Sequence, residues 1–221
     1  INHSQNIHIK DCLFTHTAST GLDLYKGVNQ SSVTGNVFKD IGGNCILVGN
    51  FSDEATEIHL PYNPTDLREV SHHIQISNNL ITDATNEDWG SVGIGVGFAH
   101  DIQITHNDIS NVHYSGISVG WGWTRHVTVL KNNLVKANKI RLYGKNMYDV
   151  AGIYTLSAQP NTQIIENVID SIYRAPYAHI PSHWFYLYTD EGSSFMTIRD
   201  NWTASTKYLQ NANGPANTWE N

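Results

Sequence analysis

Apolar and polar side chains alternate with a period of two along much of this chain, and the alternating runs recur. Each run is followed by a polar residue and then by a short apolar stretch. Such runs occur at residues 6–14, 32–38, 73–81, 101–109, 126–135, 163–169 and 196–202. Alternation of this kind predicts β-strands. Seven recurrences of the same phrase predict a solenoid, in which successive coils stack on one another.

One polar position closes each run. It is occupied by Cys12, Asn36, Asn79, Asn107, Asn133, Asn167 and Asn201. Asn occurs 23 times in the chain, which favours a fold of many short strands and turns. Asn side chains stacked coil upon coil can satisfy backbone groups at a bend, where no strand partner exists. We therefore expect an asparagine ladder along one corner of the solenoid.

A second short strand recurs in every coil, at residues 22–25, 46–49, 94–97, 117–120, 153–156 and 187–190. Its first and third positions are Leu, Ile, Val or Thr, and we expect them to stack inside the core. The second and fourth positions then face outward. They are Asp23, Leu47, Gly95, Ser118, Tyr154 and Tyr188, and Tyr25, Gly49, Gly97, Gly120, Leu156 and Asp190. This outer face changes along the solenoid from small residues to tyrosines and a carboxylate.

These patterns predict an all-β protein, a right-handed parallel β-helix of about seven coils that forms one domain over residues 1–221. Loop insertions are expected at residues 52–69, 139–147 and 174–182, gathered on one side, where they would build the binding face. The chain opens in the middle of a repeat and shows no obvious capping unit. We therefore expect it to be an excerpt of a longer protein.

Charge and composition exclude several classes of function. The net charge is −7 and basic clusters are absent, which argues against a nucleic-acid partner. No apolar run reaches the ~18 residues of a membrane span. Cys12 and Cys45 are expected to be buried free thiols. Metal-ligand spacing is lacking, so neither a metal site nor a cofactor is expected. Calcium at the acidic residues 83–88 is an alternative to an ordinary acidic loop there.

Two aspartates are the candidate catalytic residues. Asp190 ends an outward strand beside Glu191, and Asp149 lies four positions before the strand 153–156. The same offset gives His113 in the previous coil and His183 in the next, so a His–Asp–His column could tune a carboxylate for proton transfer. The alternatives are a solvated turn for Asp190 and a hydrogen-bonded corner for Asp149.

Aromatic residues surround this part of the outer face. Tyr154 and Tyr188 stand on it, and Trp121 and Trp123 follow the strand before them. Sugar rings pack their C–H faces on aromatic side chains while their hydroxyls need polar partners. The sequence therefore predicts a trough with aromatic walls that binds an oligosaccharide or polysaccharide.

Four segments, at residues 113–123, 148–162, 188–194 and 209–215, together resemble bacterial right-handed β-helix glycosidases of glycoside hydrolase family 141. That family includes α-L-fucosidase and xylanase activities on plant glycans. The resemblance implies that Asp149 and Asp190 are catalytic, although Ala151 stands where Gly is expected. Tyr114 and Glu191 lie in these segments and complete the expected substrate-binding set. A secreted, periplasmic or cell-surface bacterial protein is also implied.

The expected function is hydrolysis of a plant-type glycan by paired aspartates, with an exo-acting α-L-fucosidase preferred over a xylanase. Two alternatives stay open, a polysaccharide lyase and a non-catalytic glycan-binding solenoid. One difficulty is geometric. Asp149 and Asp190 are offset by seven positions in coil register, ~23 Å along an extended strand, whereas paired carboxylates work at roughly 5 to 10 Å. The corner before residue 153 would have to fold Asp149 back over the trough.

Overall fold

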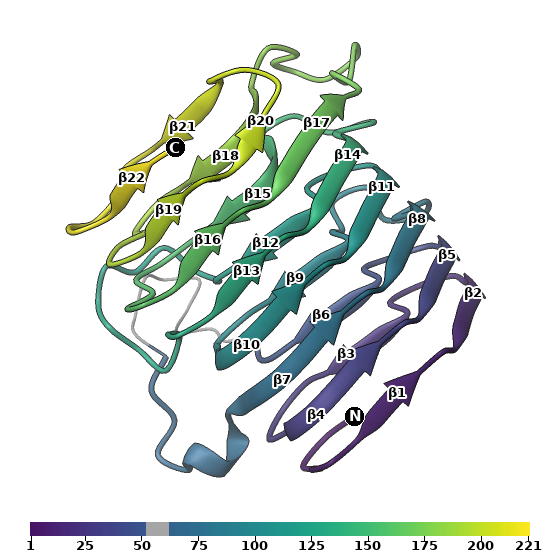
Figure 1. Ribbon diagram of the computed structural model, residues 1–221, viewed down its shortest axis with the longest axis vertical. Helices are drawn as coiled ribbons and strands as arrows, with labels where there is room; N and C mark the ends of the chain where they lie inside the picture. Colours follow the sequence, from purple (N-terminus) through teal and green to yellow (C-terminus); the bar gives the residue numbers. More distant parts are fainter. Residues whose placement is uncertain (52–61) are drawn as a thin grey trace.

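The computed structural model describes residues 1–51 and 62–221, and it confirms the predicted right-handed parallel β-helix (Figure 1). Three parallel sheets form its faces. The first contains β1 (His8–Lys10), β4 (Asn29–Thr34), β7 (Ser71–Ser77), β10 (Ala99–Thr105), β13 (Leu134–Lys136), β16 (Gln163–Ile165), β19 (Thr197–Arg199) and β22 (Thr218–Glu220). The second contains β2 (Leu13–Thr17), β5 (Val37–Ile41), β8 (Leu80–Ala84), β11 (Asp108–Val112), β14 (Lys139–Tyr143), β17 (Val168–Ile172) and β20 (Trp202–Thr203).

The third sheet is the outer face predicted to carry the site. It contains β3 (Leu22–Leu24), β6 (Ile46–Val48), β9 (Ile94–Val96), β12 (Ile117–Val119), β15 (Val150–Thr155), β18 (Trp184–Thr189) and β21 (Tyr208–Gln210). A 3₁₀ turn, η1 (Leu67–Glu69), precedes β7. No helix in the described part of the chain combines the length and apolarity needed to cross a membrane.

The register of the third sheet is the one that the sequence predicts. Ile46 pairs with Leu22 on one side and Ile94 on the other, and Ile117 pairs with Ile153. The inward positions of these strands are buried and belong to one continuous core cluster. Identical positions in successive coils therefore stack into columns, and the outward columns form a continuous surface.

An asparagine ladder runs along the corner between the first and second sheets. The Asn107 amide N–H and Nδ2 donate to Asn138 Oδ1, each at 3.0 Å. Asn138 in turn donates from its amide N–H and Nδ2 to Asn167 Oδ1, each at 3.0 Å, and from Nδ2 to the Ile104 carbonyl at 2.8 Å. The ladder extends through Cys12, Asn36, Asn79, Asn107, Asn138, Asn167, Asn201 and Asn221.

The prediction of Asn133 as the fifth corner residue of the ladder is wrong. Asn133 is not in the ladder. Its Oδ1 accepts from the Ile102 N–H and its Nδ2 donates to the Ala99 carbonyl instead. Most of the run 126–133 forms no strand, and the strand of this coil is β13, followed by Asn138. The predicted insertion at 139–147 is correspondingly wrong at its start, because residues 139–143 form β14.

Two other predictions have mixed outcomes. The loop at 174–182 is present between β17 and β18, but the predicted insertion at 52–69 falls partly on residues 52–61, outside the described residues. Both cysteines are free, as predicted, and Cys45 is buried. Cys12, in contrast, is exposed. It takes part in the ladder only through its backbone N–H, which bonds Asn36, so its side chain on the first coil is left uncovered.

Asn138→Ala tests the ladder. The substitution leaves the buried Asn107 N–H and Ile104 carbonyl without their partners, and each such group costs about 1–3 kcal/mol. We expect the free energy of unfolding, measured by urea denaturation, to fall by about 2–4 kcal/mol. Asn63→Ala, at an exposed position outside the ladder, is the control and should change stability little. Equal effects of the two substitutions would contradict the role of the ladder.

Candidate active site

A groove of about 840 Å³ lies on the third sheet. Its floor is made by outward residues of successive strands, including Leu47 of β6, Ser118 of β12, Tyr154 of β15 and Tyr188 of β18. Ile180, from the loop at 174–182, also lines it. The groove therefore lies on the outward columns that the sequence predicts, with a loop on one side.

Asp190 lies directly after β18, in the floor of the groove, and is only 6% exposed. Its Oδ1 accepts a hydrogen bond from Asn211 Nδ2 at 2.7 Å, and its Oδ2 accepts a short one from the Tyr154 hydroxyl. Its backbone N–H is fixed by the Thr155 carbonyl at 2.9 Å. Both carboxylate oxygens are therefore held in place by hydrogen-bond donors.

Asp149 lies directly before β15 and has a side chain that is 44% exposed. Its backbone has φ of 57°, a left-handed conformation that Asp tolerates better than most residues, and its N–H donates to the His183 carbonyl at 2.8 Å. The carboxylate lies against the His183 ring, with Nε2 3.0 Å from Oδ1. Asp149 is thus held by its neighbour in the next coil.

A bend in the strands brings Asp149 over the groove. Along β18, Phe185 and Tyr188 pack with the groove residues, whereas Tyr186 and Leu187 between them both pack in the core. Two successive inward residues interrupt the alternation, so the strand turns there instead of running straight. In the coil before, Gly152 occupies the bend, where a Cβ atom would lie 2.3 Å from Ile169 Cγ2.

The two aspartates border the same tyrosines. Both carboxylates line the groove, and the negative charges of both raise the pKa of Tyr114, Tyr154 and Tyr188. An effect on the same phenols requires both carboxylates to lie near them. The seven-position offset in coil register therefore does not keep the two acids apart, and both reach one groove.

Three tyrosines around the acids have pKa values far above normal. Burial is the main cause of the raised pKa of Tyr114, Tyr154 and Tyr188, and the negative charges of Asp149 and Asp190 add to it. These phenols therefore keep their protons, and the Tyr154 hydroxyl donates a hydrogen bond to Asp190. The rings of Tyr154 and Tyr188 pack perpendicular to each other with centroids 4.7 Å apart.

Aromatic and aliphatic side chains form the walls of the groove. The rings of Trp121 and Trp123 are 6.4 Å apart, and Phe51 meets Trp121 edge-on at 5.7 Å. Leu47 and Leu156 add aliphatic surface. The lining residues among the described part of the chain include neither Lys nor Arg. A neutral ligand with both apolar faces and hydroxyl groups fits this combination.

The structure brings nine of the ten predicted site residues to the groove. They are Tyr114, Trp121, Trp123, Asp149, Tyr154, His183, Tyr188, Asp190 and Glu191. His113 is the exception, because its buried ring stacks against Trp89 with centroids 5.9 Å apart and does not line the groove. Burial lowers the pKa of His113, assisted by the charge of Lys145. The predicted His–Asp–His column is thus reduced to the Asp149–His183 pair.

Sequence reasoning missed several residues of the site. Asn211, which bonds Asp190, lies after β21, a strand that the strand pattern did not single out. Tyr148 and Ile180 also line the groove. At the acidic segment 83–88, Asp88 borders the groove, but its carboxylate accepts from the Gly90 N–H at 3.3 Å and the Ser91 hydroxyl at 3.0 Å, as in an ordinary turn.

Comparison with known proteins identifies the fold family. The family model described as the right handed beta helix region matches residues 29–207, and the chain belongs to this family. A solved structure named glycoside hydrolase is 56% identical with a TM-score of 0.98, and the match covers 100% of this chain and 37% of that one. The chain thus spans little more than a third of that protein. No match was found among curated proteins.

More distant structures share the fold alone. The A-module of the mannuronan C-5 epimerase AlgE6 of Azotobacter vinelandii is 15% identical, with a TM-score of 0.62, over 98% of this chain and 58% of that one. The surface protein and adhesin PfbA of Streptococcus pneumoniae is 13% identical, with a TM-score of 0.54, over 100% of this chain and 66% of that one. These proteins differ in what they do, so the groove must decide the function.

Proposed function

We propose that this chain carries the active site of a glycoside hydrolase in which Asp149 and Asp190 are the catalytic pair. The observation that carries the proposal is that both carboxylates line one aromatic groove, around the tyrosines Tyr114, Tyr154 and Tyr188. Glycoside hydrolysis requires two carboxyl groups on either side of the scissile bond. The 56% identical structure named glycoside hydrolase supports the same class of reaction.

The two environments suggest different roles. Asp190 is buried and accepts hydrogen bonds from Asn211 and Tyr154, which fix its position in the floor of the groove. It suits the nucleophile, which must be charged when the glycosidic bond breaks. Asp149 is half-exposed and paired with His183, so it can exchange protons with water in each cycle. It suits the acid that protonates the leaving oxygen and the base that later activates water.

The separation of the acids favours retention of configuration. In retaining enzymes the two carboxyl groups are about 5–5.5 Å apart, and in inverting enzymes about 6.5–9.5 Å apart. Asp149 and Asp190 border the same three phenols, Tyr114, Tyr154 and Tyr188, and this close grouping favours the first arrangement. The reaction would then pass through a covalent glycosyl ester on Asp190, which water attacks with help from Asp149.

The side chains that line the groove indicate the class of substrate. Without Lys or Arg among the described lining residues, the groove offers no counter-charge to an acidic sugar. Leu47, Leu156 and the tryptophans provide surface for a methyl group and a sugar face. We therefore propose a terminal α-L-fucosyl residue, a neutral 6-deoxy sugar, on a plant-type glycan. A β-xylosyl unit, which lacks the methyl group, is the second choice.

A polysaccharide lyase fits the groove less well. Lyases remove a proton from a uronate with a base such as Lys, Arg or Tyr. The raised pKa values of Tyr114, Tyr154 and Tyr188 keep these phenols protonated, so their phenolates are not available as bases near neutral pH. A glycan-binding solenoid without catalysis would need the aromatic walls but not two aspartates in one groove.

The partners and location follow as part of the proposal. An oligosaccharide or polysaccharide is the partner, with no role for nucleic acid given the net charge of −7. Plant glycans lie outside the cell that degrades them. We therefore place the protein in a secreted, periplasmic or cell-surface setting in bacteria.

A panel of aryl glycosides tests the reaction class and the sugar. We expect release of the aryl group from 4-nitrophenyl α-L-fucoside and little release from the β-xyloside, because only fucose has a methyl group for the aliphatic wall. Proton NMR of the first sugar product should show the same anomeric configuration as the substrate. Hydrolysis of no glycoside, together with a product absorbing near 235 nm from a uronate polymer, would instead indicate a lyase.

Replacement of each acid tests the roles. Asp190→Asn should lower kcat by about 10³-fold or more on every substrate, because the nucleophile is lost. Asp149→Asn should cause a comparable loss on natural glycans but a smaller one on aryl glycosides with good leaving groups, which need no protonation. Asp200→Asn, at an exposed position away from the groove, is the matched control. Full activity of either groove variant, with folding verified by circular dichroism, would defeat the assignment.

A further inference from the structure

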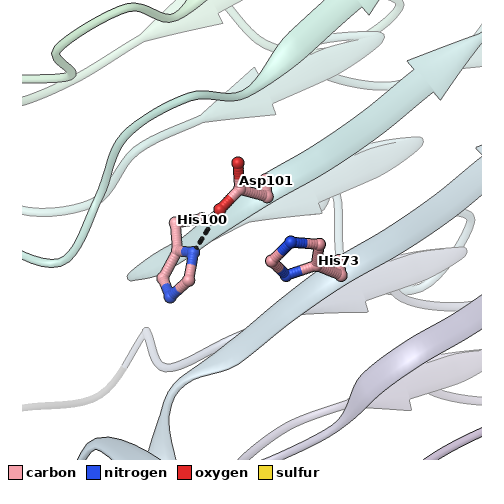
Figure 2. A group of neighbouring side chains, drawn as sticks. All are labelled: His73, His100 and Asp101. Carbon is pink, nitrogen blue, oxygen red and sulfur yellow. Dashed lines mark hydrogen bonds and ion pairs between the residues drawn. The ribbon is translucent and has the colours of Figure 1, made fainter.

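A cluster of histidines lies on the first sheet, away from the aspartate groove on the third. His72 and His73 come from β7, and His100 and Asp101 come from β10, the neighbouring strand one coil further on. The side chains of His73, His100 and Asp101 turn toward one another above these strands (Figure 2). Neither the aspartate pair nor the sugar groove accounts for this cluster.

The backbone directs these side chains to one place. His100 is in register with His72, and Ile102 with Ile74, so Asp101 lies beside His73. His73 and Asp101 both adopt left-handed conformations, with φ of 52° and 55°. This left-handed backbone conformation occurs at neighbouring positions of two adjacent coils, so it turns both side chains outward together.

Ligand atoms of His73, His100 and Asp101 lie within 4.8 Å of one another. His100 Nδ1 is 2.6 Å from Asp101 Oδ2, and Nδ1 of His72 is 2.8 Å from Nδ1 of His73. The His72 ring also stacks on His100, with centroids 5.0 Å apart and planes 4° from parallel. His72 thereby fixes the orientation of both neighbouring imidazoles.

We propose that His73, His100 and Asp101 bind one divalent transition-metal ion, of which Zn²⁺ is the prototype. Zinc and the other divalent first-row transition metals bind well to two imidazoles and a carboxylate, whereas Mg²⁺ and Ca²⁺ prefer ligand sets made only of oxygen atoms. Metal–ligand bonds of about 2.0–2.2 Å put tetrahedral ligand atoms about 3.4 Å apart. Side-chain rotations that draw the three ligands together by about 1 Å would complete the coordination, with water at the remaining position.

The spacing of these residues in the sequence does not indicate a metal site, because the ligands are divided between two coils. His73 and His100 are separated by a whole turn of the solenoid, which brings them together only when β7 pairs with β10. An open hollow that includes His73 and Asp101 gives an ion access from solvent. A bound ion would join two successive coils, so it would stabilise the folded chain over the unfolded one.

Zinc titration of the chelator-treated full chain tests the proposal. Isothermal titration calorimetry with ZnCl₂ should show one saturable site per chain. The melting temperature should rise by roughly 5 °C when free zinc reaches a hundredfold excess over Kd, and excess chelator should reverse the rise. MgCl₂ and CaCl₂ should produce no such shift.

Three variants locate the ion. His100→Asn and Asp101→Asn should each remove the saturable site and the zinc-dependent melting shift. His106→Asn replaces an exposed histidine just past the end of β10 and should leave both unchanged. A variant that does not fold by circular dichroism is replaced by His73→Asn. Unchanged zinc binding in the folded cluster variants, an equal loss in His106→Asn, or no saturable site in the wild-type chain would overturn the proposal.

Discussion

The structure depends on parallel strand pairing that stacks each coil on the one before in fixed register. Because every residue lies over its counterpart, side chains far apart in sequence form columns, and each column sets the character of one strip of surface. Leu22, Ile46 and Ile94 stack in this way inside the core. At the corner, where backbone groups lose their strand partners, the Asn138 and Asn167 side chains supply the missing hydrogen bonds.

The candidate active site is a local departure from this regularity. Where Tyr186 and Leu187 both turn inward, the strand bends, and Asp149 comes over the groove in which Asp190 lies. The same stacking that pairs Tyr154 with Tyr188 brings the Tyr154 hydroxyl to Asp190. The two acids therefore receive unlike surroundings, one buried among donors and the other exposed beside a histidine. Unlike surroundings are what a nucleophile and an acid–base residue require.

Much of the regular structure could be predicted from the sequence, because strand alternation and coil repetition are local signals. The inward and outward positions of β6, β9 and β12 are examples, and so is the tyrosine-rich groove face. The corner at Asn133 shows the limit. Asn133 comes shortly after Val129 and Leu130, just as Asn138 comes shortly after Leu134 and Val135, and only the pairing of β13 with β10 selects Asn138. A hydrophobic pattern does not distinguish a strand from an irregular stretch of the same composition.

The features of the sites that could not be predicted depend on contacts between coils. Asn211 reaches Asp190 from a later turn, and His73 meets His100 across β7 and β10. His113 shows the reverse case. Its offset in the coil matches that of Asp149, but its ring is buried against the stacked ring of Trp89 in the neighbouring loop. Equivalent position in a repeat fixes where the backbone lies, while neighbouring loops decide where the side chain goes.

The most direct test of the account is to trap the covalent intermediate with a 2-deoxy-2-fluoro-α-L-fucosyl fluoride and locate the label by mass spectrometry of peptides. A fluorofucosyl ester on Asp190, absent from the Asp190→Asn variant, is the result that converging, unlike aspartates require. A label on a residue outside the groove would contradict the account. So would turnover with inversion, in which no sugar is ever attached to the protein.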